Sequence, residues 1–379
     1  MSNDTVSVLV VDDSALMRNL ISKIIENAPG LEMAGTAMNG VFALQKIERL
    51  QPDVIVLDLE MPQMDGIGFL EQRRTRAIDI PVVVLSSIAH KGAHITMEAI
   101  SLGASDFLLK PSGSVSDDIH SIATQLTEML RGYGREYRRR KGRSTAEAPM
   151  AAHLAAAAGA SAVRTVAPTD AAPLIVEPVA AEAPPAQTEI IAIGISTGGP
   201  NALRKVFAAL DDDLPVPVVV VQHMPAGFTA EFARSLDRIC PLEVKEAEEG
   251  DLLKPGRILI APGNRHMRVE RKSLAGVVRL GDGEPCNGHR PSVDILFASL
   301  AQHYANRALA VIMTGMGRDG AVELGLVRRR GGITIGQDAS SCVVYGMPRV
   351  AFELGHVTQQ VALHQMAETI CRLAKEQRD

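Results

Sequence analysis

Short, nearly continuous aliphatic runs alternate with helical patterns along the first third of the chain. The runs are VSVLVVD, DVIVLDL, PVVVLSS and DFLLK, with a weaker one near MAGTA. Such runs predict strands covered on both faces by helices. After the first run, Leu16, Leu20 and Ile24 recur at helical spacing, with Met17 and Ile21 one residue on, which predicts an amphipathic helix. Strands that alternate with helices indicate a parallel sheet.

A second alternation begins at Glu189. Its aliphatic runs are EIIAIGIS, VPVVVVQH, GRILIAPG, LAVIMTGM and GGITIGQD, and helical patterns such as NALRKVFAAL and AEFARSLDRI lie between them. The pattern predicts a second α/β domain, doubly wound around a mostly parallel sheet. No internal repeat makes the two α/β domains copies of one another.

The segment between these alternations has a different composition. A basic run from Arg135 to Arg143 leads into AAHLAAAAGASAV and then EPVAAEAPPAQ. Ala/Pro-rich sequence without strong periodicity predicts a linker, because it cannot bury enough apolar surface to offset the entropy of ordering. The basic run fits a solvated helix end better than a contact with an acidic partner. We expect domains at 1–131 and 189–379, joined by a linker over 132–188.

Composition agrees with two domains in 379 residues, 46% of which are hydrophobic. Aromatic residues make up only 3% and Trp is absent, so the cores must be aliphatic. A net charge of −5 gives no reason to expect nucleic acid or an anionic membrane as partner. Four cysteines without CxxC spacing argue against zinc or disulfides and favour free thiols in a reducing compartment. With no signal peptide and no long apolar stretch, we expect a cytoplasmic monomer without membrane insertion.

Candidate chemistry first gathers at the strand ends of the N-terminal domain. Asp12 and Asp13 end the first predicted strand, Asp58 ends the third, Ser86 the fourth and Lys110 the fifth. The carboxyl ends of parallel strands share one edge of the sheet. Three carboxylates there repel one another unless a hard cation such as Mg²⁺ compensates. A hydroxyl and an ammonium beside them would complete a phosphoryl site.

Any one of these residues alone is better explained as a helix cap, as Asp13 or Ser14 could be. Five residues of complementary chemistry at one edge favour a functional site. The segments VVDDS, VLDLEMPQMDG, VVVLSS and DFLLKP resemble the markers of the two-component receiver family, over roughly the first third of the chain. The resemblance implies a flavodoxin-like (βα)5 fold.

The same resemblance assigns roles within the acidic cluster. It implies that Asp58 accepts a phosphoryl group from a histidine kinase. Asp12 and Asp13 would hold Mg²⁺ together with Asp58 and the main-chain carbonyl of Glu60.

Four further positions follow from the receiver resemblance. Ser86 and Lys110 would contact the phosphoryl oxygens, and Phe107 would occupy the switch-aromatic position. Pro111, directly after Lys110, matches the family's usual cis-proline turn.

A candidate nucleophile lies in the second domain. Ser196 occupies the frame Gly194-Ile195-Ser196-Thr197-Gly198, which satisfies G-x-S-x-G between an apolar strand and a helical pattern. A phosphate-binding turn is a weaker reading, because GISTGGP lacks both the G-x-G-x-x-G frame and the Walker lysine. On this motif alone, a nucleophile and a plain turn are about equally supported.

A serine nucleophile needs a base, and the base needs an orienting carboxylate. His223 follows the strand VPVVVVQ, and Asp319 follows another buried strand and a Gly-rich turn. Both would therefore lie on the same sheet edge as Ser196. His266 and His289 lie in polar loops and are candidates for substrate contacts or for support of the site.

The order Ser, His, Asp differs from that of α/β-hydrolases. It matches the order of the chemotaxis methylesterase family, CheB. Across most of residues 189–357 the chain resembles the sequence blocks of that family, in the segments ISTGGP, QHMPAGFTAEFARSLD, APGNRHM, HRPSVDILF and MTGMGRDG. The resemblance implies Ser196 as nucleophile, His223 as base and Asp319 as orienter. Main-chain amides near Met316, with Thr197 close by, would form the oxyanion hole.

The family resemblance also implies the reaction. It is hydrolysis of glutamate γ-methyl esters on methyl-accepting chemotaxis receptors for sensory adaptation, with deamidation of selected glutamines. It would be stimulated when the histidine kinase CheA phosphorylates the receiver, and the esterase step would need no cofactor. Two alternatives from the residues alone are a non-catalytic module that docks on receptors and a serine esterase for small molecules.

Overall fold

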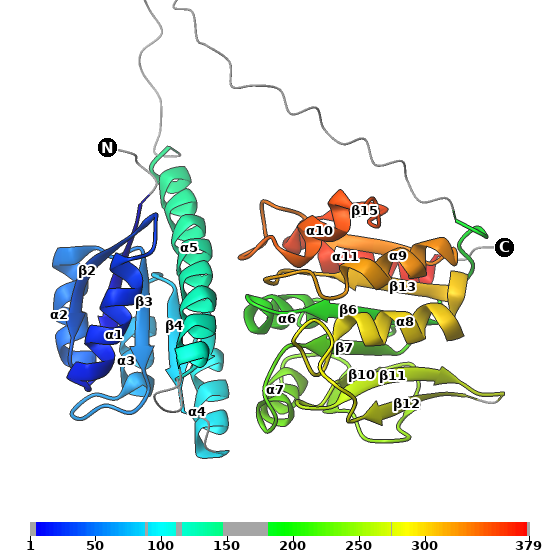
Figure 1. Cartoon of the computed structure of the whole chain (residues 1–379), viewed down its shortest axis with the longest axis horizontal. Coiled ribbons are helices and arrows are strands. Elements are labelled where there is room, and N and C mark those ends of the chain that lie inside the picture. The colour runs from blue at the N-terminus through cyan, green and yellow to red at the C-terminus, as the bar shows by residue number, and fades with distance from the viewer. Residues whose placement is uncertain (1–4, 88–89, 111–115, 147–180, 274, 377–379) are drawn as a thin grey trace, which may run out of the picture.

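Two α/β units follow one another along the chain and lie side by side (Figure 1). The computed structural model describes residues 5–87, 90–110, 116–146, 181–273 and 275–376. No helix in these ranges is long and apolar enough to cross a membrane. All four cysteines are free, as expected.

The N-terminal unit is a five-stranded sheet in the order β2-β1-β3-β4-β5, with every pair parallel. This is the flavodoxin-like order, which confirms the predicted fold. Its strands are β1 (Val6–Val11), β2 (Leu31–Ala37), β3 (Val54–Asp58), β4 (Val82–Ser86) and β5 (Asp106–Leu109). Its helices are α1 (Ala15–Glu26), α2 (Gly40–Leu50), α3 (Gly66–Thr75), α4 (His90–Ser101) and α5 (Ser116–Ala146).

Helix α1 forms where expected, and most of its predicted apolar stripe faces the core, but Leu16 does not. Leu16 is 76% exposed, whereas Ile21 and Ile25 are buried against the sheet. Met17 and Ile24 pack partly against the same core. The helix row that contains Met17 and Ile21 is the buried one, because it faces Val8 and Val10 of β1.

Helix α5 continues to Ala146, past the domain boundary expected at 131. Tyr133 and Tyr137 are buried, so this part of the helix packs on the protein. The basic run is therefore the end of a helix, as favoured from sequence, and the helix occupies the first part of the expected linker. Residues 147–180 of that linker lie outside the described residues.

The C-terminal unit is built on a seven-stranded sheet in the order β15-β14-β13-β6-β7-β10-β8, with every pair parallel. Its strands are β6 (Ile190–Ile195), β7 (Val218–Gln222), β8 (Glu243–Glu246), β10 (Arg257–Ile260), β13 (Ala308–Ile312), β14 (Ile333–Gln337) and β15 (Gln359–Val361). The α-helices are α6 (Gly199–Phe207), α7 (Phe228–Asp237), α8 (Val293–His303), α9 (Ala321–Arg329), α10 (Met347–Glu353) and α11 (Met366–Lys375). Short 3-10 helices span Ala305–Arg307 and Leu363–Gln365.

A small antiparallel sheet in this unit was not anticipated from sequence. Strands β11 (His266–Arg271) and β12 (Gly276–Gly281) form a hairpin, and β9 (Leu252–Leu253) pairs with β12. Alternating polar and apolar residues here give weaker runs than the buried parallel strands.

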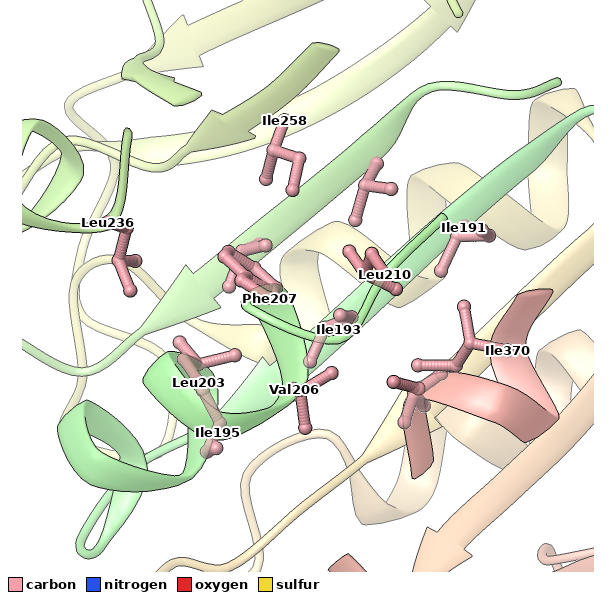
Figure 2. Packing of buried hydrophobic residues seen from close by; sticks show 14 of the residues in the cluster. Ile191, Ile193, Ile195, Leu203, Val206, Phe207, Leu210, Leu236, Ile258 and Ile370 are labelled. Carbon is pink, nitrogen blue, oxygen red and sulfur yellow. The ribbon is translucent and has the colours of Figure 1, made fainter. Parts of the chain in front are cut away.

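Strand β6 lies at the centre of the large sheet and divides the core in two. Ile191, Ile193 and Ile195 enter one hydrophobic cluster with Phe207 of α6, as Figure 2 shows, while Ile190 enters the cluster on the other face. From β6 the chain first builds outward through β7, then returns to β13 on its other side. This reversal is a topological switch point, where open parallel sheets form ligand crevices.

Candidate active site

The receiver residues meet at one edge of the first sheet, as predicted. Carboxylate oxygens of Asp12, Asp13 and Asp58 all lie within 4.8 Å of one another. Asp12 and Asp58 are buried, because β1 and β3 end in the interior of the crevice. Lys110 Nζ lies 2.7 Å from Asp58 Oδ2 and 3.3 Å from Asp12 Oδ2.

The donor set fits a hard cation. Asp12 Oδ2 is buried and, among the described residues, has no hydrogen-bond donor, although it is ion-paired with Lys110. Burial and the charge of Asp58 raise the pKa of Asp12, and a cation would oppose both effects. Asp58 Oδ1 accepts a hydrogen bond from the Glu60 amide at 3.3 Å, so the main chain of Glu60 lies at this site.

Ser86 contacts α4 of the receiver, and Phe107 contacts α7 of the second domain. Ser86 Oγ hydrogen-bonds Thr96 Oγ1 of α4 at 2.6 Å. The Phe107 ring stacks on Phe228 of α7, with ring centroids 5.1 Å apart and planes inclined by 7°. Pro111 lies outside the described residues.

Ser196 lies in a tight turn between β6 and α6. Its amide donates to the Thr314 carbonyl at 3.0 Å, and its carbonyl accepts from the Gly199 amide at 2.8 Å. Gly198 has φ +85°, a conformation that side chains rarely adopt. A Cβ on Gly315 would lie 2.8 Å from the Ser196 Cβ. The turn therefore requires small residues on both sides of the hydroxyl.

The structure brings Ser196, His223 and Asp319 into one chain of hydrogen bonds. His223 Nδ1 lies 3.1 Å from Ser196 Oγ, and His223 Nε2 lies 2.8 Å from Asp319 Oδ2. The side chains of His223 and Asp319 are only 8% and 1% exposed. This is the geometry that a serine nucleophile, its base and an orienting carboxylate require.

Asp319 is held by several further donors. Asn287 Nδ2 and Ser292 Oγ donate to its Oδ1 at 3.0 and 2.8 Å, and the Val293 amide donates to Oδ2 at 2.7 Å. Burial alone would raise the pKa of Asp319, but the hydrogen bond and charge of His223, with these donors, hold it well below its usual range. The carboxylate is therefore ionised where it contacts His223.

Both histidines were predicted to lie in polar loops, but only His289 does, whereas His266 begins strand β11. The His289 ring stacks on His223, with centroids 3.8 Å apart and planes inclined by 10°. Burial and the neighbouring His223 lower the pKa of His289 to about 4. His266 is buried instead, with Nε2 2.9 Å from the Glu284 carbonyl. Of the two, only His289 lines the cavity at Ser196.

A cavity of about 710 Å³ adjoins the hydroxyl, and both domains line it. Thr197 and Met316 contribute from the catalytic domain, and strand β5 with the following Lys110 contributes from the receiver. Asp106 Oδ2 accepts a hydrogen bond from the Gly198 amide at 2.7 Å, two residues after the serine. Burial raises the pKa of Asp106 to about 6.

Sequence reasoning missed the supporting residues Asn287, Ser292, Asp106 and Phe228. Ser292 lies within the HRPSVD block and Asn287 two residues before it, so a search for polar residues in and near that block could have found them. Asp106 contacts Gly198 and Phe228 contacts Phe107, in both cases across the domain boundary. No local pattern in the chain signals such contacts.

Comparisons with known proteins agree with this arrangement. The family model described as CheB methylesterase matches residues 191–370, and the response regulator receiver domain model matches residues 8–134. A protein-glutamate methylesterase/protein-glutamine glutaminase of Treponema denticola is 55% identical over 98% of this chain and 99% of its own length. The protein of the same name from Treponema pallidum is 54% identical over 99% of this chain and 98% of its own length.

Among solved structures, the CheB methylesterase catalytic domain of Thermotoga maritima is 39% identical, with a TM-score of 0.48. The match covers 49% of this chain and 98% of the chain in that structure.

Proposed function

The chain belongs to the CheB methylesterase family of hydrolases and carries a response regulator receiver domain. We propose that it is a phosphorylation-activated protein-glutamate methylesterase and protein-glutamine glutaminase. Its substrates are methyl-accepting chemotaxis receptors, and its reaction belongs to sensory adaptation in the cytoplasm. The observation that carries the proposal is the hydrogen-bonded series Ser196–His223–Asp319 at a cavity between the two domains.

In the proposed reaction, Ser196 Oγ attacks the ester carbonyl while His223 Nδ1 takes its proton. The bond from the carbonyl carbon to the methoxy oxygen then breaks, and His223 returns the proton so that methanol leaves. Water attacks the acyl-enzyme by the same route and releases glutamate. Amides near Met316, with Thr197 beside them, stabilise the oxyanion. Both residues line the cavity at Ser196, which supports this assignment.

Deamidation follows the same course, since a glutamine side chain differs from the ester only in its leaving group. The protonated His223 then gives its proton to departing ammonia.

In the proposed control mechanism, the unphosphorylated receiver restricts access to Ser196. The stacking of Phe107 on Phe228 and the hydrogen bond from Gly198 to Asp106 support this view, because both tie β5 to the walls of the crevice. The chemotaxis histidine kinase CheA phosphorylates Asp58. Lys110, which pairs with Asp58, follows β5 directly, so a change at Asp58 is transmitted to the strand that carries Phe107.

Magnesium fits the receiver through Asp12, Asp13 and Asp58, with the main-chain carbonyl of Glu60. When bound, the ion supplies positive charge that balances the phosphoryl group and the carboxylates. Ser86 and Lys110 complete the site by donating to phosphoryl oxygens, and we assign no cofactor to the esterase step.

Methanol release from methylated receptor fragments, with and without a small-molecule phosphoryl donor and Mg²⁺, tests the proposal. We expect the donor to raise the rate. The Ser196→Ala variant should release no methanol while keeping its fold, and Asp58→Ala should keep the basal rate without the increase.

Two outcomes contradict these assignments. Turnover in Ser196→Ala would remove Ser196 as nucleophile, and a full response to the donor in Asp58→Ala would remove the phosphorylation switch. A wild-type protein that hydrolyses aryl esters but no receptor fragment would be a general esterase instead.

A further inference from the structure

One loop of the catalytic domain contacts two members of the hydrogen-bonded series at once. It runs from Cys286 to Asp294, where α8 has begun. Its His289 lies flat on His223, and its Asn287 donates to Asp319. None of its residues supplies the hydroxyl, the proton-accepting nitrogen or the orienting carboxylate, yet the loop contacts both His223 and Asp319.

A two-residue turn fixes where His289 lies. Cys286 and His289 exchange two backbone hydrogen bonds of 3.1 and 2.9 Å, around Asn287 and Gly288. These two central residues have φ +52° and +79°. Asn-Gly is the preferred pair where both central residues of a turn need positive φ. The backbone of His289 is therefore set by local sequence as well as by packing.

Anchors on both sides hold the turn against the domain. On one side, Asn287 Nδ2 donates to Asp319 Oδ1 at 3.0 Å and to Asp294 Oδ2 at 2.5 Å. On the other, Arg290 donates from Nε and Nη2 to Asn264 Oδ1 at 3.1 and 2.7 Å, and from Nη1 to main-chain carbonyls. His289 lies between the anchored residues Asn287 and Arg290, so the loop holds the His289 ring in place against His223.

The contact between the two rings constrains the orientation of His223. Both hydrogen bonds of His223 leave from atoms in the plane of its ring, toward Ser196 and Asp319. A second ring parallel to that plane, with centroids 3.8 Å away, resists tilting of the imidazole out of it. A tilt lengthens both hydrogen bonds together, and small displacements of a catalytic group reduce rates steeply.

Charge is consistent with this arrangement. The titratable groups that face His289 are His223, at the end of β7, and Asp319, in the loop after β13. The lowered pKa of His289, about 4, keeps it neutral near pH 7. A neutral neighbour lets His223 take up the serine proton without a second positive charge stacked 3.8 Å from it.

We propose that His289 is a positioning residue of the esterase, whose neutral ring holds His223 in the plane that joins Ser196 to Asp319. This inference rests on the proposed function for its substrate, but not for its geometry. The position requires a flat, uncharged ring, and it does not require His289 to act as an acid or a base.

The test compares full-length His289→Ala and His289→Phe with the wild type. Methanol release from methylated receptor fragments gives kcat and KM, and the labelling rate of Ser196 by a fluorophosphonate reports nucleophile activation without receptor substrate. We expect His289→Ala to lower kcat and the labelling rate about tenfold with little change in KM. His289→Phe, which keeps a flat neutral ring, should recover most of both rates.

Three outcomes decide the question. An unchanged labelling rate in His289→Ala, or a Phe variant as slow as the Ala variant, overturns the proposal. Thermal midpoints show whether a slow variant is also unfolded, and the Phe variant, if folded, still decides the role of the ring. If the labelling rates of the wild type and the two variants follow the expected order but the wild type releases no methanol, the proposed substrate is wrong while the positioning role stands.

Discussion

Asp319 and His289 bind protons unusually weakly for their residue types, and both do so at the same small site. In each case burial and the charge of the neighbouring group decide the result. The hydrogen bonds to Asp319 outweigh its burial and lower its pKa, while burial itself lowers the pKa of His289. Both shifts make the folded state release protons that the unfolded chain still binds.

These shifts predict a loss of stability in acid. His289 titrates near 6.5 when unfolded and near 4 when folded, so between these values the unfolded chain holds the extra proton. Stability therefore falls as the pH decreases from about 7 to 4. In urea titrations at pH 7 and pH 5, His289→Phe should lose less stability on acidification than the wild type.

Exposed His364 offers a matched control for this prediction. His364→Phe should lose as much stability as the wild type between the two pH values. If the wild type and His289→Phe show the same difference, His289 does not carry a lowered pKa in the folded protein.

At the level of elements, the four-residue strand β5 connects groups of the receiver with groups of the catalytic domain. Asp106 and Phe107 reach Gly198 and Phe228 of the catalytic domain, and Lys110, directly after the strand, pairs with Asp58. Helix α4 joins this set through the hydrogen bond of Thr96 to Ser86. Strand β5 thus links Asp58 to the turn that carries Ser196.

This arrangement predicts that Asp106→Ala raises the basal esterase rate. The change removes the carboxylate that accepts a hydrogen bond from the Gly198 amide and so ties β5 to the turn at Ser196. Hydrogen bonds to charged groups contribute about 1.5–3 kcal/mol, so the basal rate without phosphoryl donor should rise about tenfold. Methanol release without donor is the measurement.

Asp79→Ala is the matched control, because Asp79 is exposed and pairs with Arg140 on the receiver itself. It should keep the basal rate of the wild type. An Asp106→Ala protein as restrained as the wild type would show that this hydrogen bond does not hold the domains together.

At the scale of the whole molecule, the two domains share one hydrophobic cluster. Ala93 and Met97 of α4 belong to the same core as Phe228 and Phe232 of α7. Val343 of the catalytic domain packs on the receiver core, and Arg139 of α5 donates to the Ser340 carbonyl. A buried, apolar contact of this kind stabilises the observed arrangement of the two domains.

Removal of the receiver should therefore release the esterase. A fragment of residues 181–379 keeps the Glu182–Arg330 ion pair and the seven-stranded sheet. If nine-tenths of full-length molecules are closed, the fragment should be roughly tenfold faster without phosphoryl donor. Its rate should not respond to the donor, and a fragment slower than the unphosphorylated full chain would contradict autoinhibition.

Much of the fold could be predicted because each signal is local. The buried parallel strands are continuous aliphatic runs, and residues that follow them must share one sheet edge, which is why Asp12, Asp58 and Lys110 could be grouped from spacing alone. In the predicted α1 stripe Ile21 is buried but Leu16 is exposed, since two adjacent apolar rows fit the same periodicity and only β1 decides between them. The β11–β12 hairpin was missed because its half-exposed strands lack such a run.

By itself, the sequence determined the two α/β domains, the strand-end positions of the candidate residues and the turn chemistry around Ser196, because these depend on neighbours a few residues apart. Only the tertiary structure decided that Asp106 accepts a hydrogen bond from the Gly198 amide, that Phe107 stacks on Phe228 and that His289 stacks on His223. These contacts join residues that are far apart in the chain. The packing of whole elements brings them together, and that packing depends on the full set of buried surfaces at once.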